Sequence, residues 1–209
     1  MSLPSILLVG AGGHARACID VIEHEGRFAV AGLIGLASEV GSTVLGYPVL
    51  GSDEDLPVLT ERFGRALIAV GQIKTSAARE RIFSRLMELG CTMPTIVSPR
   101  GYVSRHAQVG MGTIVMHGAI VNAAAVVGQN CILNSHSLVE HDAVIGDHCH
   151  VSTNVAVNSG VRVGEGTFIG SGTSVRQGLT IGARCVIGMG QRVLADCADG
   201  QRIPPSRAT

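Results

Sequence analysis

The residue pair with the clearest chemical capacity in this sequence is His141 followed directly by Asp142. A histidine can accept a proton near neutral pH, and an adjacent carboxylate can orient the ring and stabilise the imidazolium that forms. The pair therefore indicates a general base. The alternative is a solvated histidine beside a solvated aspartate on an outer corner. No Gly-x-Ser-x-Gly motif occurs, so a serine acyl-enzyme is not indicated.

A glycine-rich turn near the N-terminus has the composition of a phosphate-binding loop. Gly10, Gly12 and Ala15 follow the apolar run Ile6-Leu7-Leu8-Val9 and open a helical pattern that reaches about Glu25. Glycine lets a phosphate approach the backbone, and a helix N-terminus supplies N–H groups and a positive dipole. The turn therefore indicates a phosphorylated ligand, with a tight turn that binds nothing as the alternative.

A nicotinamide cofactor is not favoured at this turn. Such a cofactor requires an acidic residue near the end of the second strand to bind the ribose. The sequence has Gly35 and Leu36 at that place, and the nearest acid is Glu39. Because the segment is also short for a complete dinucleotide fold, we expect a mononucleotide or a nucleotide-sugar.

The elements that must position the His-Asp pair follow from a repeat of six residues. Sixteen consecutive sixth positions are Val, Ile or Leu, namely Val103, Val109, Val115, Val121, Val127, Leu133, Val139, Ile145, Val151, Val157, Val163, Ile169, Val175, Ile181, Ile187 and Val193. No helix has this period and a plain strand has a period of two, whereas hexapeptide repeats are typical of parallel β-helices. An aromatic content of 3% suits the narrow interior of such a fold.

The six-residue frame also predicts which cysteine and histidine side chains point into the coil and which point outward. Four of the six cysteines take the fifth place of their hexads, namely Cys131, Cys149, Cys185 and Cys197. We predict that they fill the interior as small apolar residues and form neither disulfides nor metal sites. His148 and His150 flank Cys149 like a metal chelate, but Cys149 points inward in this frame and its neighbours point elsewhere, so no metal is predicted.

The bulk composition excludes some classes of protein. The 209 residues contain 16 basic and 16 acidic side chains, so a basic surface for nucleic acid is not indicated. No run of about 18 apolar residues occurs, which predicts no membrane span. The first five residues lack the basic region of a signal peptide, so we expect a cytoplasmic protein.

Two domains of different class are predicted, an α/β domain followed by an all-β domain. Residues 1–95 alternate strands at 6–9, 28–34 and 66–70 with helices, one of which Thr75 or Ser76 can cap and Gly90 can stop. This pattern predicts a small Rossmann-like fold with a parallel sheet. Residues 96–209 hold a parallel β-helix of about five coils over 101–195. A tail over 199–207 has turn composition and no hexad.

Five segments carry a resemblance to a known family, namely Leu8-Val9-Gly10-Ala11-Gly12-Gly13-His14-Ala15, Ala69-Val70-Gly71, Ile132-Leu133-Asn134, Val139-Glu140-His141-Asp142-Ala143-Val144-Ile145-Gly146-Asp147 and His150-Val151. Through them the chain resembles, over nearly its whole length, the hexapeptide acyltransferases that N-acetylate amino-sugar nucleotides. It also resembles their relatives known as sialic-acid O-acetyltransferases, which together form the NeuD/PglD-like family. The glycine turn combined with a His-Asp pair in the middle of the coil is much more specific than the hexads.

The resemblance implies a left-handed coil, a homotrimer and acetyl-CoA as the cosubstrate between neighbouring coils, with no metal. By similarity the catalytic residues are the base His141 with Asp142 and Asn134. The resemblance assigns His150 to the thioester and Ser171 and Met189 to the CoA arm. It assigns the nucleotide-sugar to Gly12, Gly13, His14, Gly35, Leu36 and Gly71.

Three positions depart from the pattern of the family. Relatives often have two acids where this chain has Gly35 and Leu36, and often Asn or Asp where it has Gln72. The usual closing motif Gly-x-Pro-Ala followed by a basic residue is replaced by Ile203-Pro204-Pro205-Ser206-Arg207. The nucleotide preference and the adenine end of the CoA site are therefore expected to differ.

Four functions compete on these residues. The first is N-acetylation of a nucleotide-linked 4-amino-sugar of the 4,6-dideoxyhexose type for a surface glycan or glycoprotein. The second is O-acetylation of sialic acid or another sugar hydroxyl, which needs base help more than an amine does. The third is a trimeric scaffold without catalysis, against which the retained His141 and Asp142 argue. The fourth is a metal-dependent hydratase of the carbonic-anhydrase type, which needs three converging histidines.

Overall fold

Residues 2–205 are described by a computed structural model, and they divide into two compact units. The first unit contains the residues up to Gly71 together with Ala78–Ile96, and the second contains Gln72–Ala77 and the residues from Val97 onward. The short segment 72–77 therefore belongs with the hexad repeat, although it lies within the N-terminal part of the sequence.

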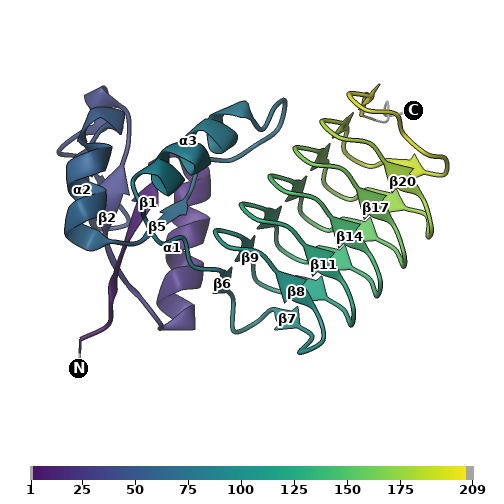
Figure 1. The fold of residues 1–209 in the computed structure, drawn as a ribbon, viewed down its shortest axis with the longest axis horizontal. Helices are drawn as coiled ribbons and strands as arrows, with labels where there is room; N and C mark the ends of the chain where they lie inside the picture. The colour runs from purple at the N-terminus through teal and green to yellow at the C-terminus, as the bar shows by residue number, and fades with distance from the viewer. Residues whose placement is uncertain (1, 206–209) are drawn as a thin grey trace. The chain divides into compact units, whose positions relative to one another are not determined.

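The first unit is built on a five-stranded sheet of order β3-β4-β2-β1-β5 (Figure 1). Its strands are β1 (Ser5–Val9), β2 (Ala29–Ile34), β3 (Thr43–Val44), β4 (Tyr47–Gly51) and β5 (Ala66–Ile68). All pairings are parallel except β3 with β4, which form a hairpin. The three strands that the sequence predicts are confirmed, and the hairpin at the edge of the sheet is an addition to them.

Three helices accompany this sheet, namely α1 (Gly13–Glu25), α2 (Leu56–Phe63) and α3 (Ala77–Glu88), with short 3₁₀ turns η1 (Ala37–Glu39) and η2 (Asp53–Asp55). Helix α1 ends at Gly26, whose left-handed backbone returns an N–H to the last turn. Helices α2 and α3 share a buried cluster with Leu7 and Val9 of β1, so both cover one face of the sheet. Helix α2 has only two turns, which leaves too little periodicity for a prediction from sequence.

The second unit is a parallel β-helix of two-residue strands in three sheets (Figure 1). The seven-stranded sheet contains β6 (Ile96–Val97), β9 (Ile114–Val115), β12 (Ile132–Leu133), β15 (His150–Val151), β18 (Phe168–Ile169), β21 (Val186–Ile187) and β23 (Arg202–Ile203). The six-stranded sheet contains β7 (Tyr102–Val103), β10 (Ile120–Val121), β13 (Leu138–Val139), β16 (Ala156–Val157), β19 (Ser174–Val175) and β22 (Arg192–Val193). The five-stranded sheet contains β8 (Gln108–Val109), β11 (Val126–Val127), β14 (Val144–Ile145), β17 (Arg162–Val163) and β20 (Thr180–Ile181).

The repeat of six fixes both the register and the core of this unit. Each coil has 18 residues, so Ile120 pairs with Leu138 and Val121 with Val139. The hexad Val, Ile and Leu residues stack on one another inside the coil and are almost all buried. The predicted parallel β-helix and its inward positions are therefore confirmed.

The corners of the coil also repeat every six residues. Three residues after each inward aliphatic residue from Val109 to Ile187 the backbone is left-handed, and half of these places are glycine. The remainder are Ala124, Asn130, His136, Asp142, His148, Asn154 and Arg184, each with φ between 52° and 62°. Asp142 therefore occupies a corner position at which an L-amino acid is disfavoured and at which Asn, Asp and Gly are the least costly residues.

The β-helix extends beyond the predicted 101–195 at both ends, which corrects the prediction of a tail without strands. β6 begins the seven-stranded sheet, and β23 ends it by pairing with β21. The final coil has 16 residues instead of 18, as Val186 pairs with Arg202. This shortening breaks the period of six, so the hexad frame cannot find β23. Pro204 and Pro205 follow β23, whereas Ser206 and Arg207 of the closing motif lie outside the described residues.

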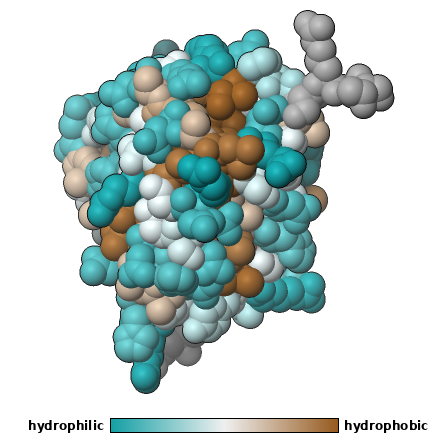
Figure 2. All heavy atoms as spheres, turned by 90° about the vertical axis from the view of Figure 1, so that its right-hand side faces the viewer, coloured by the Kyte–Doolittle hydropathy of each residue, from teal (hydrophilic) through white to brown (hydrophobic). Residues whose placement is uncertain are grey.

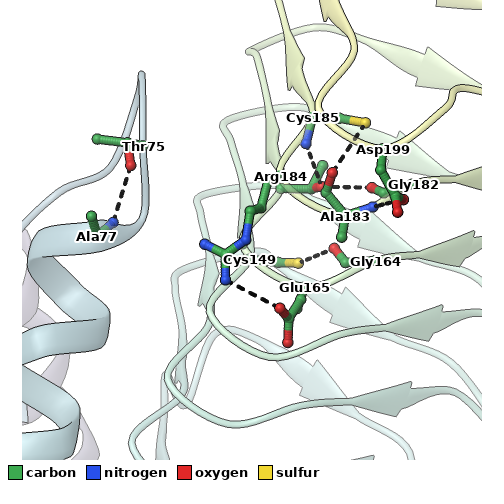
Figure 3. Close-up of polar contacts among 12 residues, drawn as sticks. Thr75, Ala77, Cys149, Gly164, Glu165, Gly182, Ala183, Arg184, Cys185 and Asp199 are labelled. Atoms are coloured by element: carbon green, nitrogen blue, oxygen red, sulfur yellow. Dashed lines mark hydrogen bonds and ion pairs between the residues drawn. The ribbon is translucent and has the colours of Figure 1, made fainter.

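The interior cysteines are buried, as predicted, and the thiols of Cys131, Cys149 and Cys185 each donate to a carbonyl oxygen of the next coil. The thiol of Cys149 donates to the carbonyl oxygen of Gly164 at 3.1 Å (Figure 3). The thiol of Cys185 donates to the carbonyl oxygen of Ala198, also at 3.1 Å. Thr167 lies in the same column and its hydroxyl donates in the same way to Gly182 at 2.9 Å. The hydrogen bond with Cys131, together with burial, raises the pKa of Cys149, so this thiol stays protonated at neutral pH.

No helix within residues 2–205 has the length and apolar character that a membrane span requires. The face shown in Figure 2 mixes hydrophilic residues with separate hydrophobic patches. In the β-helix, the large apolar side chains that are exposed comprise Tyr102, Met111, Ile120, Val126, Met189 and Leu194.

Candidate active site

The His-Asp pair lies on the corner of the β-helix between β13 and β14. Nδ1 of His141 lies 2.7 Å from Oδ2 of Asp142, and Nε2 lies 2.9 Å from the hydroxyl of Ser159. A carboxylate only accepts hydrogen bonds, so it fixes the neutral ring with its proton on Nδ1. The lone pair is then on Nε2, where the Ser159 hydroxyl donates to it. The histidine is held in the tautomer that a base requires.

Two acids increase the basicity of this ring. The hydrogen bond and the charge of Asp142, with a smaller contribution from Glu140, raise the pKa of His141 above its ordinary value. The side chains of His141 and Asp142 are 58% and 66% exposed, so solvent screens this interaction. Glu140 is itself fixed, because it accepts from the Asn122 side-chain amide at 3.0 Å and from the His141 backbone N–H at 3.1 Å.

Ser159 is a site residue that the sequence reasoning missed. It lies 18 residues after His141, which places it at the same corner of the next coil. The repeat carries this signal, because any side chain one coil away is a direct neighbour. Serine at a corner has many ordinary explanations in a sequence, and only the observed contact with Nε2 distinguishes it.

A second polar cluster, centred on His150, lies on the outer face of the seven-stranded sheet. His150 is buried, and its Nδ1 lies 2.7 Å from the backbone carbonyl of Gln72, which makes Nδ1 the donor. Nε2 then accepts from the side-chain amide of Asn134 at 3.2 Å. The Phe168 ring packs edge-on against the imidazole at 5.2 Å. Both ring nitrogens have a partner and the side chain is buried, so His150 is held as a fixed polar group.

Asn134 is therefore brought together with His150. Its amide bonds to His150, and its carbonyl oxygen accepts from the Ser135 backbone N–H at 2.8 Å. Gln72, in the segment 72–77, lies against this cluster. Its side chain is buried and donates to the Gly166 carbonyl at 3.2 Å. Gln72 is one of the three departures from the family, and here its backbone carbonyl sets the tautomer of His150.

Ser171 and Met189 lie on successive coils at the corners that follow β18 and β21. The Ser171 hydroxyl lies 2.9 Å from that of Ser152, and Met189 is 62% exposed. Gly170 directly precedes Ser171 at this corner, and a Cβ added to it would lie 2.6 Å from the Met189 backbone N. The two coils are thus in close contact at Gly170, beside the small side chain of Ser171 and the flexible side chain of Met189.

The glycine turn of the first unit leaves the N-terminus of α1 open. Gly12 and Gly13 are exposed, and a Cβ added to either would have no atom within 4 Å. Packing of the chain therefore does not require glycine at these two positions, in contrast to Gly10, where a Cβ would lie 2.9 Å from Ala69. His14 lies beside Gly71, 3.7 Å from the place of its missing Cβ.

This turn lies at the topological switch point of the sheet. β1 is flanked by β2 on one side and β5 on the other, and the carboxyl ends of all three meet at one edge. Ligands of open α/β sheets bind in the crevice at such a point. Gly35, at the end of β2, donates to the Gly51 carbonyl at 3.0 Å, and the next residue, Leu36, is 70% exposed.

The His148-Cys149-His150 segment does not converge on one point. His148 bonds through Nδ1 to the Asn130 amide at 2.9 Å, Cys149 points into the coil, and His150 bonds to Gln72. Each of the three side chains is directed to a different partner, so they do not form a chelate.

Comparison with known proteins shows which family the chain belongs to. Residues 5–86 match the PglD N-terminal domain, and residues 142–177 match the bacterial transferase hexapeptide family. A perosamine N-acetyltransferase from Caulobacter crescentus, solved with CoA and GDP-perosamine, is 31% identical, with a TM-score of 0.90 over 96% of this chain and 93% of that one. The acetyltransferase domain of PglB from Neisseria gonorrhoeae, solved with acetyl coenzyme A, is 26% identical, with a TM-score of 0.85 over 96% of each chain. No curated protein matched in a separate comparison of sequences.

The fold, the glycine turn after β1 and the His141 corner of the coil together define the class of the protein. It is a hexapeptide-repeat acyltransferase with a left-handed parallel β-helix. Within that class the chain belongs to the NeuD/PglD-like family of sugar acetyltransferases. The resemblance seen in the sequence, the fold class and the enzyme class are thereby confirmed.

Proposed function

We propose that the chain transfers the acetyl group of acetyl-CoA to the amine of a nucleotide-linked amino-sugar of the 4-amino-4,6-dideoxyhexose type. The observation that carries the proposal is the corner at which Asp142 and Ser159 hold the His141 ring with its lone pair on Nε2. The relative solved with CoA and GDP-perosamine, itself named as an N-acetyltransferase, supports this choice of acceptor.

In the proposed reaction the substrate amine attacks the carbonyl carbon of the thioester. His141 Nε2 takes the proton that the amine loses as the C–N bond forms, and the C–S bond breaks to release the thiolate of CoA. Asp142 stabilises the imidazolium through its bond to Nδ1, at 2.7 Å. The Ser159 hydroxyl would have to yield its place on Nε2 to the amine. Much of the acceleration would come from holding both substrates in attack geometry.

The cosubstrate is assigned to the corners of the seven-stranded sheet. His150, fixed by Gln72 and Asn134, offers a rigid polar surface for the thioester. Ser171 and the exposed Met189 lie on successive coils after β18 and β21, where they would line the pantetheine arm. These roles are carried over from the family, position by position.

The nucleotide-sugar is assigned to the crevice of the first unit. Gly12 and Gly13 leave the backbone N–H groups of the α1 N-terminus open, which suits a diphosphate. His14 and Gly71 would contact the sugar, and Gly35 and Leu36 the nucleoside. The open space at Gly12 and Gly13 supports a ligand because internal packing does not explain glycine there.

The working enzyme is proposed to be a homotrimer. His141 and Asp142 are more than half exposed, so one chain alone leaves its base on open surface. On both sides of this corner the outward residues are apolar, with Ile120 and Val126 each 37% exposed and Leu138 and Val144 half-buried beside them. A second copy over this corner would bury these residues and exclude water from the site. A cytoplasmic location stays a prediction.

The proposal is tested by thiol release from acetyl-CoA with UDP-, GDP- and dTDP-linked 4-amino-sugars, and with free sialic acid as the acceptor for the O-transfer alternative. Turnover on an amino-sugar nucleotide that falls about 10²- to 10⁴-fold in His141→Asn is expected. Turnover on the free sugar alone would replace the proposal by O-acetylation. No turnover on any acceptor, with acetyl-CoA shown to bind, would contradict both.

A further inference from the structure

The carboxylate of Glu39 lies against the end of β2, beside the glycine turn. Its Oε2 accepts from the Leu36 backbone N–H at 2.8 Å. A Cβ added to Gly35 would lie 2.7 Å from this oxygen and 3.0 Å from the Cβ of Ala11. The carboxylate therefore occupies the space that a side chain at Gly35 would enter, directly beside the turn that follows β1.

A similar arrangement occurs after β4, and both carboxylates cap a 3₁₀ turn. Asp55 accepts from the Ser52 backbone N–H at 2.9 Å, and the three atoms nearest to an added Cβ at Gly51 all belong to Asp55. Capping of a 3₁₀ turn accounts for Asp55 completely. Glu39 differs in its surroundings, since the backbone it caps also contacts the glycine turn through Ala11.

Glu39 retains hydrogen-bonding capacity in this position. Its Oε2 accepts one backbone N–H, and no hydrogen bond to its Oε1 is formed by any residue from 2 to 205. A carboxylate offers about four lone-pair directions, so O–H and N–H donors of a ligand can be accepted beside the existing bond. In an open α/β sheet with phosphates at the first helix, the ribose lies at the end of the second strand, where an acid binds its hydroxyl groups.

We propose that Glu39 determines nucleoside specificity by accepting hydrogen bonds from the ribose, its 2′-hydroxyl included. This inference rests on the proposed nucleotide-sugar function. Gly35 and Leu36 carry no acid, and Glu39 reaches the same place from three residues further along the chain. A site that hydrogen-bonds a hydroxyl rejects the analogue that lacks it. The enzyme is therefore selective for ribonucleotides and against 2′-deoxyribonucleotides such as dTDP.

The test is calorimetric binding of UDP against 2′-deoxy-UDP and of GDP against 2′-deoxy-GDP, because each pair differs only in the 2′-hydroxyl. Wild type, Glu39→Gln, Glu39→Ala and the matched variant Asp55→Ala are compared, each after a thermal melt establishes that it is folded. Wild type and Asp55→Ala are expected to favour the ribose form about tenfold. Glu39→Ala is expected to bind both forms of a pair equally, and Glu39→Gln to lie between.

Two results would overturn the role of Glu39 while leaving a nucleotide site in place. One is equal binding of the ribose and deoxyribose forms by wild type, and the other is a preference that persists in Glu39→Ala. Failure of all four nucleotides to bind wild type would remove the nucleotide site as well. The acetyl-transfer assay uses unaltered Glu39, so the proposed reaction is judged independently of this result.

Discussion

His141 has a defined proton-acceptor direction because each of its ring nitrogens faces one partner. The Nδ1–H group donates a hydrogen bond to Asp142 at 2.7 Å, and Ser159 faces Nε2 at 2.9 Å. An exposed histidine without these contacts would exchange tautomers and rotate freely. The His-Asp pair alone therefore does not fix the orientation of the His141 ring, and Ser159, one coil later, supplies the second contact that does.

Removal of the Asp142 charge is expected to change the pH dependence of acetyl transfer. A general base acts when unprotonated, so activity falls as the pH drops through its pKa. Asp142 raises the pKa of His141, and Asp142→Asn will therefore move the acidic limb of the kcat/KM profile to lower pH. The maximal rate will fall as well, because a weaker base removes the proton less effectively. A limb that stays in place would show that another group titrates.

The backbone at Asp142 has φ of 62°, in the region that L-amino acids disfavour. Asp142→Gly is expected to leave the free energy of unfolding unchanged or higher by up to about 1 kcal/mol, since glycine relieves this strain but orders at a greater entropic cost. Acetyl transfer should nevertheless fall as in Asp142→Asn. Chemical denaturation and kinetics on the same samples would show the two effects separately, and a large loss of stability would contradict the argument.

The corner between strands is the element that determines how tightly the coils stack. An added Cβ at Gly146 would lie 2.8 Å from the Glu165 backbone N, and one at Gly164 would lie 2.4 Å from that of Ala183. These glycines are required by the approach of the next coil, whereas Gly12 and Gly13 in the first unit have open space around them.

Gly146→Ala is accordingly expected to destabilise the β-helix by about 1–3 kcal/mol, because the next coil must move to admit the methyl group. Gly13→Ala serves as the matched control. It meets no atom and lies in the first turn of α1, so it should not lower the melting temperature. Thermal melts of both variants decide this point, and equal losses would contradict the packing argument.

Gly13→Ala also tests the binding role of the turn. A methyl group at the α1 N-terminus would occupy the space assigned to a phosphate, so the KM for the nucleotide-sugar should rise about tenfold or more. The KM for acetyl-CoA should not change, because that site lies on the β-helix. An unchanged KM for both substrates would remove Gly13 from the binding site.

Much of the β-helix follows from sequence because each hexad is a local pattern that repeats without a gap. Val139 and Ile145 must point inward, and His141 must then lie on the corner between them. The features that the sequence did not predict depend on contacts between segments that are far apart in the chain. The Gln72 carbonyl that sets the His150 tautomer and the 16-residue coil that ends in β23 leave no periodic trace. Glu39 was recognisable as the nearest acid, but its position against Gly35 required the structure.

At the scale of the whole molecule, an exposed base beside an apolar surface predicts that activity depends on assembly. Ile120→Glu would place a charge on the surface that the proposed trimer buries, at an outward position that leaves the coil interior intact. We expect sedimentation to show monomers and acetyl transfer to be lost, with the melting transition of the coil retained. Arg192→Glu, on the same sheet but outside the apolar group, is the control. A trimeric Ile120→Glu would exclude this surface.

A coil of stacked strands has an open row of backbone groups at its last turn, which invites another chain to add to it. Here β23 is followed by Pro204 and Pro205, the second of which lies over Gly188 of the preceding coil. Neither proline has an N–H group, so neither can donate to a further strand. The pair therefore removes two donors from the exposed edge of the last coil within residues 2–205, which disfavours the addition of another strand there.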